Sequence, residues 1–411
     1  MIDAATLVIT GARAITLAGP PGLRRGGDMS ALGIRACADI FIAGDRVVGV
    51  EPADAIAVPR SARVVEAGGR VVMPGFIDCH THACFAGSRI DEWELKLRGV
   101  PYLDILRAGG GIMSTVRATR ECPAAELARL TRNRLEAMLA AGSTTIEVKS
   151  GYGLSAEGEL HMLRTIVAAA SGPGRAVPDV VLTALLGHAI EGEHKEFVGA
   201  TVERTLSAVS SEFPGIPVDA FCEVGSWAVE DVIALFRAAA LRGHPLRLHA
   251  DQFNSLGGLG AAVELNARTV DHLEASSDQD LCRLAHSGTI AVGLPICGFH
   301  LDGRYAKLRT VIDAGGAVAI ASNFNPGSAP SWSIPFAMAL AARHCGLSPA
   351  EAICGVTVNA AAALGLGDRG RIESGLRADL VVLNETDERS LVYAFANDSV
   401  AHVVAAGRLI R

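Results

Sequence analysis

The spacing of apolar residues divides the chain into three stretches. In residues 1–70, short runs such as 38–50 and 62–75 alternate apolar and polar positions, and turns rich in Gly and Pro separate them. Successive side chains of a strand point to opposite faces, so this alternation predicts the strands of a half-exposed sheet.

The middle stretch has a different pattern, in which helical spacing alternates with short apolar runs. Leu127, Leu130, Leu135 and Met138 recur at helical spacing, and a strand-like run, 144–150, follows them. Repeated helix-then-strand units predict parallel strands covered by helices, and both an open doubly wound sheet and a closed barrel fit this pattern. The same unit recurs in residues 228–251, 278–295 and 305–322.

Short strands return near the end of the chain. Residues 378–383 and 402–410 have strand patterns, and we expect them to join the N-terminal strands in one small β domain built from both chain ends. The length of 411 residues fits one large domain of about 250 residues with such a companion.

Charge and cysteine content narrow the class of protein. The net charge is −7 and basic residues do not cluster, so we do not expect nucleic-acid binding. The nine cysteines are an odd number and form no CxxC pair. This usage indicates reduced, mostly buried thiols in a cytoplasmic protein.

We expect neither a signal peptide nor a membrane span. The N-terminal sequence MIDAATLVIT lacks a basic region followed by an apolar segment. The uncharged run 317–342 contains Pro326, Pro330 and Pro335, so we interpret it as a strand, a loop and the start of a helix.

The most informative string for chemistry is PGFIDCHTH, residues 74–82. His80 and His82 are two positions apart after an apolar strand, so on extended backbone they point to the same face and could bind one metal ion. Two histidines at this spacing could equally be solvated loop residues. The full nine-residue string is much more specific than the pair.

This string resembles the amidohydrolase superfamily, whose first barrel strand ends in HxH. That superfamily also places histidines after strands five and six and an aspartate after strand eight. His249 in PLRLHAD and His272 in TVDHLE match the two histidines. The resemblance implies a TIM-type (β/α)8 barrel over residues 73–360, with a composite β-sandwich domain from residues 1–72 and 361–411. It also implies one divalent metal ion, zinc or iron, held by His80, His82 and His249, with His272 orienting water or substrate.

Within the superfamily the chain resembles the imidazolonepropionases over nearly its whole length. The matching strings include GSRIDEWELKLRGVPYLDIL (87–106), TTIEVKSGYGL (144–154) and HADQFNSLGG (249–258). Enzymes of this family open 4-imidazolone-5-propanoate to N-formimidoyl-L-glutamate in histidine degradation, so the resemblance implies a substrate that carries a propionate. It implies a substrate pocket that includes Arg89 as a carboxylate clamp, Tyr102, Tyr152 and His188, and backbone N–H groups of the loop with Asn325, Gly327 and Ser328 around an anionic group. A homodimer is implied by the resemblance alone.

Two positions depart from the family pattern. Asn323 in ASNFNPG stands where the strand-eight aspartate is expected, and Gln252 stands where some relatives have glutamate. An amide oxygen can approach a metal weakly, but an amide cannot act as a base near neutral pH. We hypothesise that a metal with only neutral ligands is a stronger Lewis acid, and that His272 then takes the proton.

Asn323 leaves three interpretations open. The chain could be an imidazolonepropionase that uses asparagine, or a hydrolase or desulfhydrase acting on a related hydantoin- or thiohydantoin-propionate ring, with Cys297 near the ring. It could also be a metal-binding pseudoenzyme or an inactivated variant. Retention of Arg89, Tyr152 and the HxH pair favours an enzyme.

Overall fold

A computed structural model describes residues 2–100, 104, 108–172 and 174–411 of the chain and contains two separate sheets. The larger arrangement is an eight-stranded parallel sheet in which neighbours in sequence are neighbours in space, from β6 to β13. Its strands are β6 (Phe76–Asp78), β7 (Ser143–Lys149), β8 (Asp179–Gly187), β9 (Val218–Cys222), β10 (Leu246–Ala250), β11 (Thr269–His272), β12 (Ile290–Gly293) and β13 (Val318–Ile320).

The first and last strands of this sheet meet just beyond their carboxyl ends, which closes the barrel. Thr81 and Phe324 form a parallel bridge. The N–H of His82 donates to the carbonyl of Phe324 over 2.9 Å, and the N–H of Asn323 donates to the carbonyl of His80 over 3.1 Å. The predicted TIM-type barrel is therefore confirmed, and its closure brings residues 80–82 beside residues 323–324.

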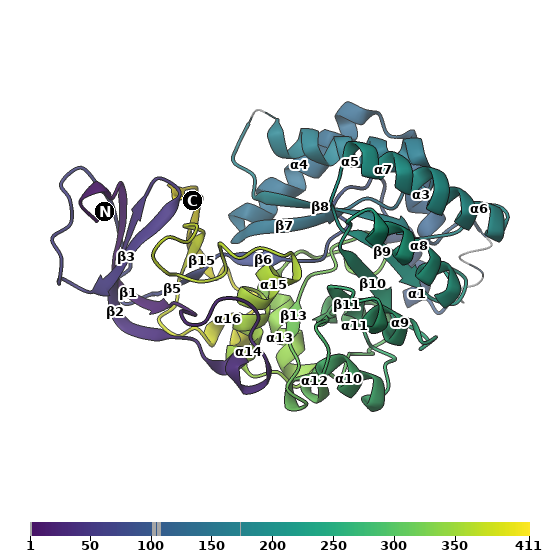
Figure 1. The fold of residues 1–411 in the computed structure, drawn as a ribbon. Coiled ribbons are helices and arrows are strands. Elements are labelled where there is room, and N and C mark those ends of the chain that lie inside the picture. Colours follow the sequence, from purple (N-terminus) through teal and green to yellow (C-terminus); the bar gives the residue numbers. More distant parts are fainter. Residues whose placement is uncertain (1, 101–103, 105–107, 173) are drawn as a thin grey trace.

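Helices follow the strands and cover the outside of the barrel (Figure 1). Between β6 and β9 they are α1 (Ile90–Leu97), α3 (Ile112–Glu121), α4 (Ala124–Ala140), α5 (Ala156–Ser171), α6 (His194–Ala200), η3 (Thr201–Thr205) and α7 (Leu206–Glu212). Between β9 and β13 they are α8 (Val229–Leu241), α9 (Gly258–Glu264), α10 (Asp278–Ala285), α11 (Pro295–Leu301) and α12 (Leu308–Asp313). After β13 come α13 (Ile334–His344), α14 (Pro349–Gly355) and α15 (Val358–Ala363).

The second sheet combines strands from both ends of the chain. The order is β16-β15-β14-β5-β1-β2-β3, with β4 paired to β1, so the C-terminal strand β14 lies directly against β5. The N-terminal strands are β1 (Leu7–Ile15), β2 (Ile34–Ala43), β3 (Arg46–Pro52), β4 (Arg63–Glu66) and β5 (Val71–Pro74). The C-terminal strands are β14 (Leu380–Leu383), β15 (Val400–Ala405) and β16 (Arg408–Leu409). Short helices η1 (Ile2–Ala4), η2 (Gly26–Ser30) and α16 (Ser390–Tyr393) lie among the described residues at the two chain ends.

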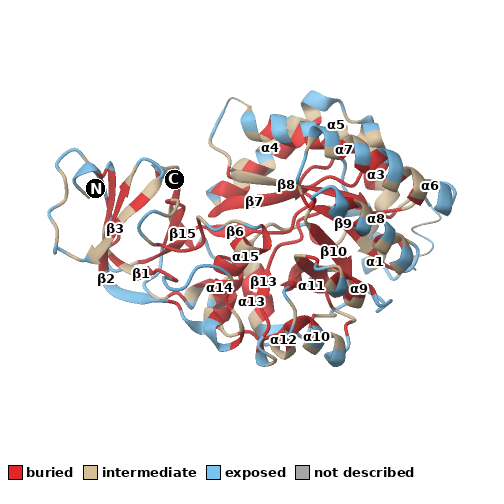
Figure 2. Cartoon of the chain, in the orientation of Figure 1, coloured by how far each residue is buried: buried red, intermediate tan, exposed pale blue. Residues whose placement is uncertain are grey.

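Burial follows the barrel strands and much of the mixed sheet, whereas the start of β2, most of β4 and the outer faces of the barrel helices are exposed (Figure 2). Gly75 connects the sheets at the junction of β5 and β6, where an added Cβ would lie 2.3 Å from Thr144 Oγ1. In the described part of the chain, no helix combines the length and apolar character needed to cross a membrane.

Candidate active site

Three histidines converge at the carboxyl end of the barrel, where enzymes with this fold place their chemistry. His80 and His82 follow β6, and His249 lies near the end of β10. Each side chain can offer one nitrogen so that the three nitrogens lie within 4.8 Å of one another. All three residues are at most 3% exposed.

Carboxylates behind two of the three histidines, His80 and His249, select the nitrogen that faces the centre. His80 Nδ1 lies 2.6 Å from Asp271 Oδ2, and His249 Nδ1 lies 3.0 Å from Asp219 Oδ1. When each Nδ1–H donates to its carboxylate, the opposite nitrogen, Nε2, keeps its lone pair for a metal. Burial, followed by nearby positive groups, lowers the pKa of His80, His82 and His249 well below the usual value, so these rings are neutral at neutral pH.

The remaining polar atoms of this centre fit a cation. Nε2 of His82 and Nε2 of His249 lie 3.4 Å apart. If neither Nε2 carries a proton, their two lone pairs face each other. Among the described residues, nothing hydrogen-bonds to the buried Nε2 of His80 or the buried Oδ1 of Asn323. Asn323 has a φ of +56°, a left-handed conformation that asparagine tolerates better than most residues. Three imidazoles and an amide oxygen are suitable donors for a divalent ion such as zinc.

His272 ends β11 beside this centre and contacts a second group of side chains. Its Nδ1 lies 3.2 Å from Glu274 Oε1, and the nearby Cys297 Sγ accepts a hydrogen bond from Gln252 Nε2 over 3.1 Å. Burial works against the charged imidazolium, but Glu274 and the hydrogen bond with Cys297 outweigh it and raise the pKa of His272 to about 10. A φ of +87° at His272 aims this ring out of the regular strand.

A cavity of about 610 Å³ opens beside the histidines, and most of the predicted substrate residues line it. Arg89 precedes α1 and forms an ion pair with Glu92, with 2.6 Å between Nε and Oε1. A Cβ added at Gly327 would lie 3.0 Å from Arg89 Nη1, so glycine allows the guanidinium to approach this loop. The predicted residues that line the cavity are His82, Arg89, Tyr152, His188, His249, Gln252, His272, Asn323, Asn325, Gly327 and Ser328.

The loop after β13 has an internal hydrogen-bonded turn, and its predicted role around an anionic group stays a prediction. The N–H groups of Gly327 and Ser328 both donate to Asn325 Oδ1 over 2.8 Å. The asparagine side chain thus closes a local turn and uses these donors. The Ser328 hydroxyl belongs to the same turn, because it accepts from Asn325 Nδ2 over 2.8 Å and donates to Asn325 Oδ1 over 3.2 Å, and both residues line the cavity.

A second loop, residues 150–154 after β7, places Tyr152 in the cavity wall. The carboxylate of Glu159 in α5 accepts the N–H groups of Gly151, Gly153 and Leu154 over 2.7–2.8 Å. His188 Nδ1 lies 2.9 Å from the Gly151 carbonyl, and burial lowers the pKa of His188 to about 4. The predicted pocket residue Tyr102 lies outside the described residues.

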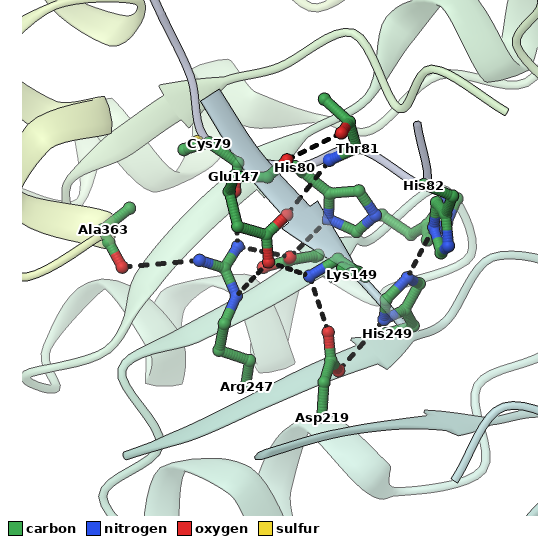
Figure 3. A network of polar contacts seen from close by, with 12 residues as sticks. Cys79, His80, Thr81, His82, Glu147, Lys149, Asp219, Arg247, His249 and Ala363 are labelled. Atoms are coloured by element: carbon green, nitrogen blue, oxygen red, sulfur yellow. Dashed lines mark hydrogen bonds and ion pairs between the residues drawn. The ribbon is translucent and has the colours of Figure 1, made fainter. Parts of the chain in front are cut away.

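Sequence reasoning missed the charged residues inside the barrel, which we call the ionic cluster: Glu147, Lys149, Asp219, Arg247 and Asp271. Figure 3 labels the first four of them. All five are completely buried. Lys149 Nζ contacts Glu147 Oε1 at 2.7 Å and Asp219 Oδ2 at 2.8 Å, and Arg247 Nη2 contacts Asp271 Oδ2 at 2.9 Å. The available signal was the presence of charges inside apolar strands, as in TTIEVKS, because buried charges require partners. Glu274, two residues after His272 in TVDHLE, was missed in the same way.

Comparisons with known proteins agree with this architecture. Residues 71–410 match the model of the amidohydrolase family. The chain is 43% identical to an imidazolonepropionase of Deinococcus radiodurans over 94% of this chain and 95% of the relative, and 42% identical to one of Rubrobacter xylanophilus over 95% and 94%.

Solved structures support the fold. A triazine hydrolase variant superimposes with a TM-score of 0.71 at 19% identity, covering 98% of this chain and 94% of the other. Atrazine chlorohydrolase from Arthrobacter aurescens TC1, solved with zinc, gives a TM-score of 0.70 at 18% identity with the same coverage. From the family match and the two full-length relatives, we conclude that this chain belongs to the amidohydrolase family and, within it, to the imidazolonepropionases.

Proposed function

We propose that this protein is a metal-dependent hydrolase that opens the ring of 4-imidazolone-5-propanoate and produces N-formimidoyl-L-glutamate. The observation that carries the proposal is the combination of full-length similarity to imidazolonepropionases with three neutral histidines beside a cavity that Arg89 lines. Water adds its oxygen to the ring carbonyl carbon, the adjacent ring C–N bond breaks, and the released nitrogen takes a proton.

One divalent ion, zinc or iron, is the cofactor of this proposal. His80, His82 and His249 would hold it through Nε2, and Asn323 would offer its amide oxygen as a neutral fourth donor. When bound, the ion polarises the ring carbonyl and makes water more acidic. The proposal also includes a cytoplasmic location, which cell fractionation would test. It further includes a homodimer, which analytical sedimentation would test.

The cavity residues would hold the substrate. Arg89 would clamp the propionate, because a guanidinium matches a carboxylate with two parallel hydrogen bonds. The Ser328 hydroxyl lies on the same cavity wall, on the loop whose Gly327 leaves room for Arg89. Tyr152 and His188 would pack against the ring, and the turn that Asn325 closes fixes the loop. Tyr102 remains a predicted pocket residue.

His272 would move the proton. With Glu274 beside it, this imidazole is strongly basic, and the charge of a divalent ion held by the three histidines would lower its pKa. His272 would then take a proton from the attacking water and return it to the ring nitrogen. Gln252 cannot exchange a proton at neutral pH, and its amide, held against Cys297, would orient the ring by hydrogen bonding.

The test is turnover by purified protein whose metal content has been measured. The substrates are imidazolone-propionate and the corresponding hydantoin and thiohydantoin, each with the unaltered protein and with Asn323→Asp. We expect the unaltered protein to open imidazolone-propionate promptly. Activity on another ring alone would move the function to that ring, and activity only after Asn323→Asp would identify the chain as an inactive form.

A further inference from the structure

The ionic cluster packs against the three histidines, and its members reach them from several strands (Figure 3). Asp271 in β11 contacts His80, and Asp219 in β9 contacts His249. Glu147 Oε2 in β7 accepts the backbone N–H of Thr81 over 3.0 Å. Thr81 stands between His80 and His82, so this bond fixes the backbone that carries both.

Lys149 connects two of these carboxylates. Its ammonium contacts Glu147 Oε1 and Asp219 Oδ2, so each carboxylate uses one oxygen for Lys149 and the other toward the histidines. Glu147 accepts a hydrogen bond from the N–H of Thr81, and Asp219 is hydrogen-bonded to His249. One buried ammonium therefore spans the distance between the HxH segment and the histidine of β10.

Packing alone does not explain this lysine. Taking an ammonium and its carboxylates out of water is costly, and replacing a buried ion pair by apolar residues of similar volume is often neutral or stabilising. A network that fixes the orientation of metal ligands gives such charges a function, because groups behind the ligands tune metal affinity.

We infer that Lys149 is a positioning residue that holds the HxH segment and His249 at the separation required by one shared cation. The inference rests on the metal site of the proposed function. Lys149 touches neither substrate nor cation in this assignment. It acts by keeping Glu147 and Asp219 in place, and Arg247 supports Asp271 behind His80 in the same manner.

The experiment measures zinc affinity by chelator competition, in the absence of substrate, on variants whose folding has been checked. Lys149→Met keeps the approximate volume and removes the ammonium. We expect zinc binding to weaken tenfold to a hundredfold, the usual range for such outer residues, and the visible spectrum of the cobalt-substituted protein to change. Arg369→Met is the matched control, because Arg369 is also buried and pairs with Asp179 at 2.5 Å, but contacts none of the three histidines.

Two further variants distinguish a positioning role of Lys149 from an effect of its positive charge. Glu147→Gln with Lys149→Met removes one charge of each sign, so restored affinity would reduce the role of Lys149 to net charge and overturn the inference. If Lys149→Met does not fold, Glu147→Asp shortens one arm of the network and should also weaken zinc binding. Affinity within twofold of the unaltered protein, with an unchanged cobalt spectrum, would overturn the inference. Because no substrate is used, these outcomes are independent of the ring that the enzyme opens.

Discussion

Asn323 is the residue whose chemistry differs most from that expected at its position. Its buried amide oxygen has no hydrogen-bond partner among the described residues, and it follows β13 beside the histidines. Every donor around the metal position is therefore neutral. The negative charge nearest to the histidines belongs to Asp219 and Asp271, one layer behind them.

Asn323→Asp should tighten zinc binding. The change keeps the size and a tolerated left-handed backbone, and it adds a negative oxygen close to the cation. We expect a gain of about tenfold in affinity, equivalent to about 1.4 kcal/mol. Chelator competition measures it, and identical affinities of the two proteins would place this side chain outside the coordination sphere.

Glu274→Gln should lower the pKa of His272. The carboxylate is the largest influence that raises this pKa, and without it only Cys297 remains to oppose the desolvation of the buried ring. In the metal-free protein the charged imidazolium contributes stability that is present below about pH 6.5 and is lost as the pH rises toward about 10. The variant should lose this alkaline dependence.

NMR titration of the metal-free protein measures the pKa of the His272 ring. Denaturant unfolding between pH 6 and 10 measures how the free energy of unfolding depends on pH. A ring that titrates unchanged in Glu274→Gln would contradict the assignment of Glu274 as its main partner.

Arg89→Met should damage catalysis selectively for substrates with a carboxylate. Loss of a paired, largely buried guanidinium costs about 2–5 kcal/mol, so kcat/KM for imidazolone-propionate should fall at least about thirtyfold. Arg164→Met is the control, since Arg164 pairs with Glu212 on the surface. If kcat/KM falls equally for a ring that lacks the propionate, Arg89 does not recognise the carboxylate.

At the scale of single residues, the resemblance of the HxH string to the amidohydrolase superfamily implied three candidate metal ligands, and strand position alone did not. The structure brings His80, His82 and His249 together, because parallel strands of a barrel end at one face. The partnership of Lys149 with Asp219 could not be predicted in this way. It depends on which strands become neighbours and on how far the side chains reach across the interior, and neither follows from apolar spacing.

At the scale of elements, the loop after β7 shows how a helix shapes the cavity. Glu159 lies in α5, yet its two oxygens accept three backbone N–H groups of residues 150–154. Tyr152 is therefore held by an element that does not reach the cavity itself. Apolar spacing does not show that a glutamate of α5 turns back to the preceding loop.

Glu159→Gln should loosen this loop. An amide replaces one acceptor oxygen by a donor, so at least one N–H group faces another donor, at a cost of about 1–3 kcal/mol. We expect a lower free energy of unfolding and a higher KM, because Tyr152 loses its fixed position. Glu157→Gln, an exposed change in the same helix, should alter neither quantity in denaturant unfolding and steady-state kinetics.

At the scale of the whole molecule, the barrel and the mixed sheet account for the two regimes of apolar spacing. The closed barrel could not be distinguished from an open sheet by that spacing, because both contain helix-then-strand units. The choice required the resemblance of the HxH string, and the bridge between Thr81 and Phe324 shows the closure directly.

Removal of metal should destabilise the whole protein, and acid should add to the effect. Zinc at one hundred times its dissociation constant stabilises a folded protein by about 2.7 kcal/mol. In the metal-free protein the buried neutral His188 contributes stability that is present above about pH 6.5 and is lost as the pH falls toward about 4.

Denaturant unfolding with zinc and with chelator, from pH 7.5 to 4.5, checks both effects. His188→Gln should reduce the acid dependence of the chelated protein. A free energy of unfolding that does not respond to zinc would argue against a metal site formed only in the folded state.

The bridge between Thr81 and Phe324 also has a consequence for biosynthesis. The residues that join there are separated by most of the chain, so a nascent polypeptide presents His80 and His82 long before Asn323 leaves the ribosome. The three histidines are all synthesised by residue 249, but the wall that holds them is complete only when the last barrel strand docks. Metal loading would thus report that synthesis has passed Phe324 and that the barrel has closed, and chains terminated before the last barrel strand would remain without the ion.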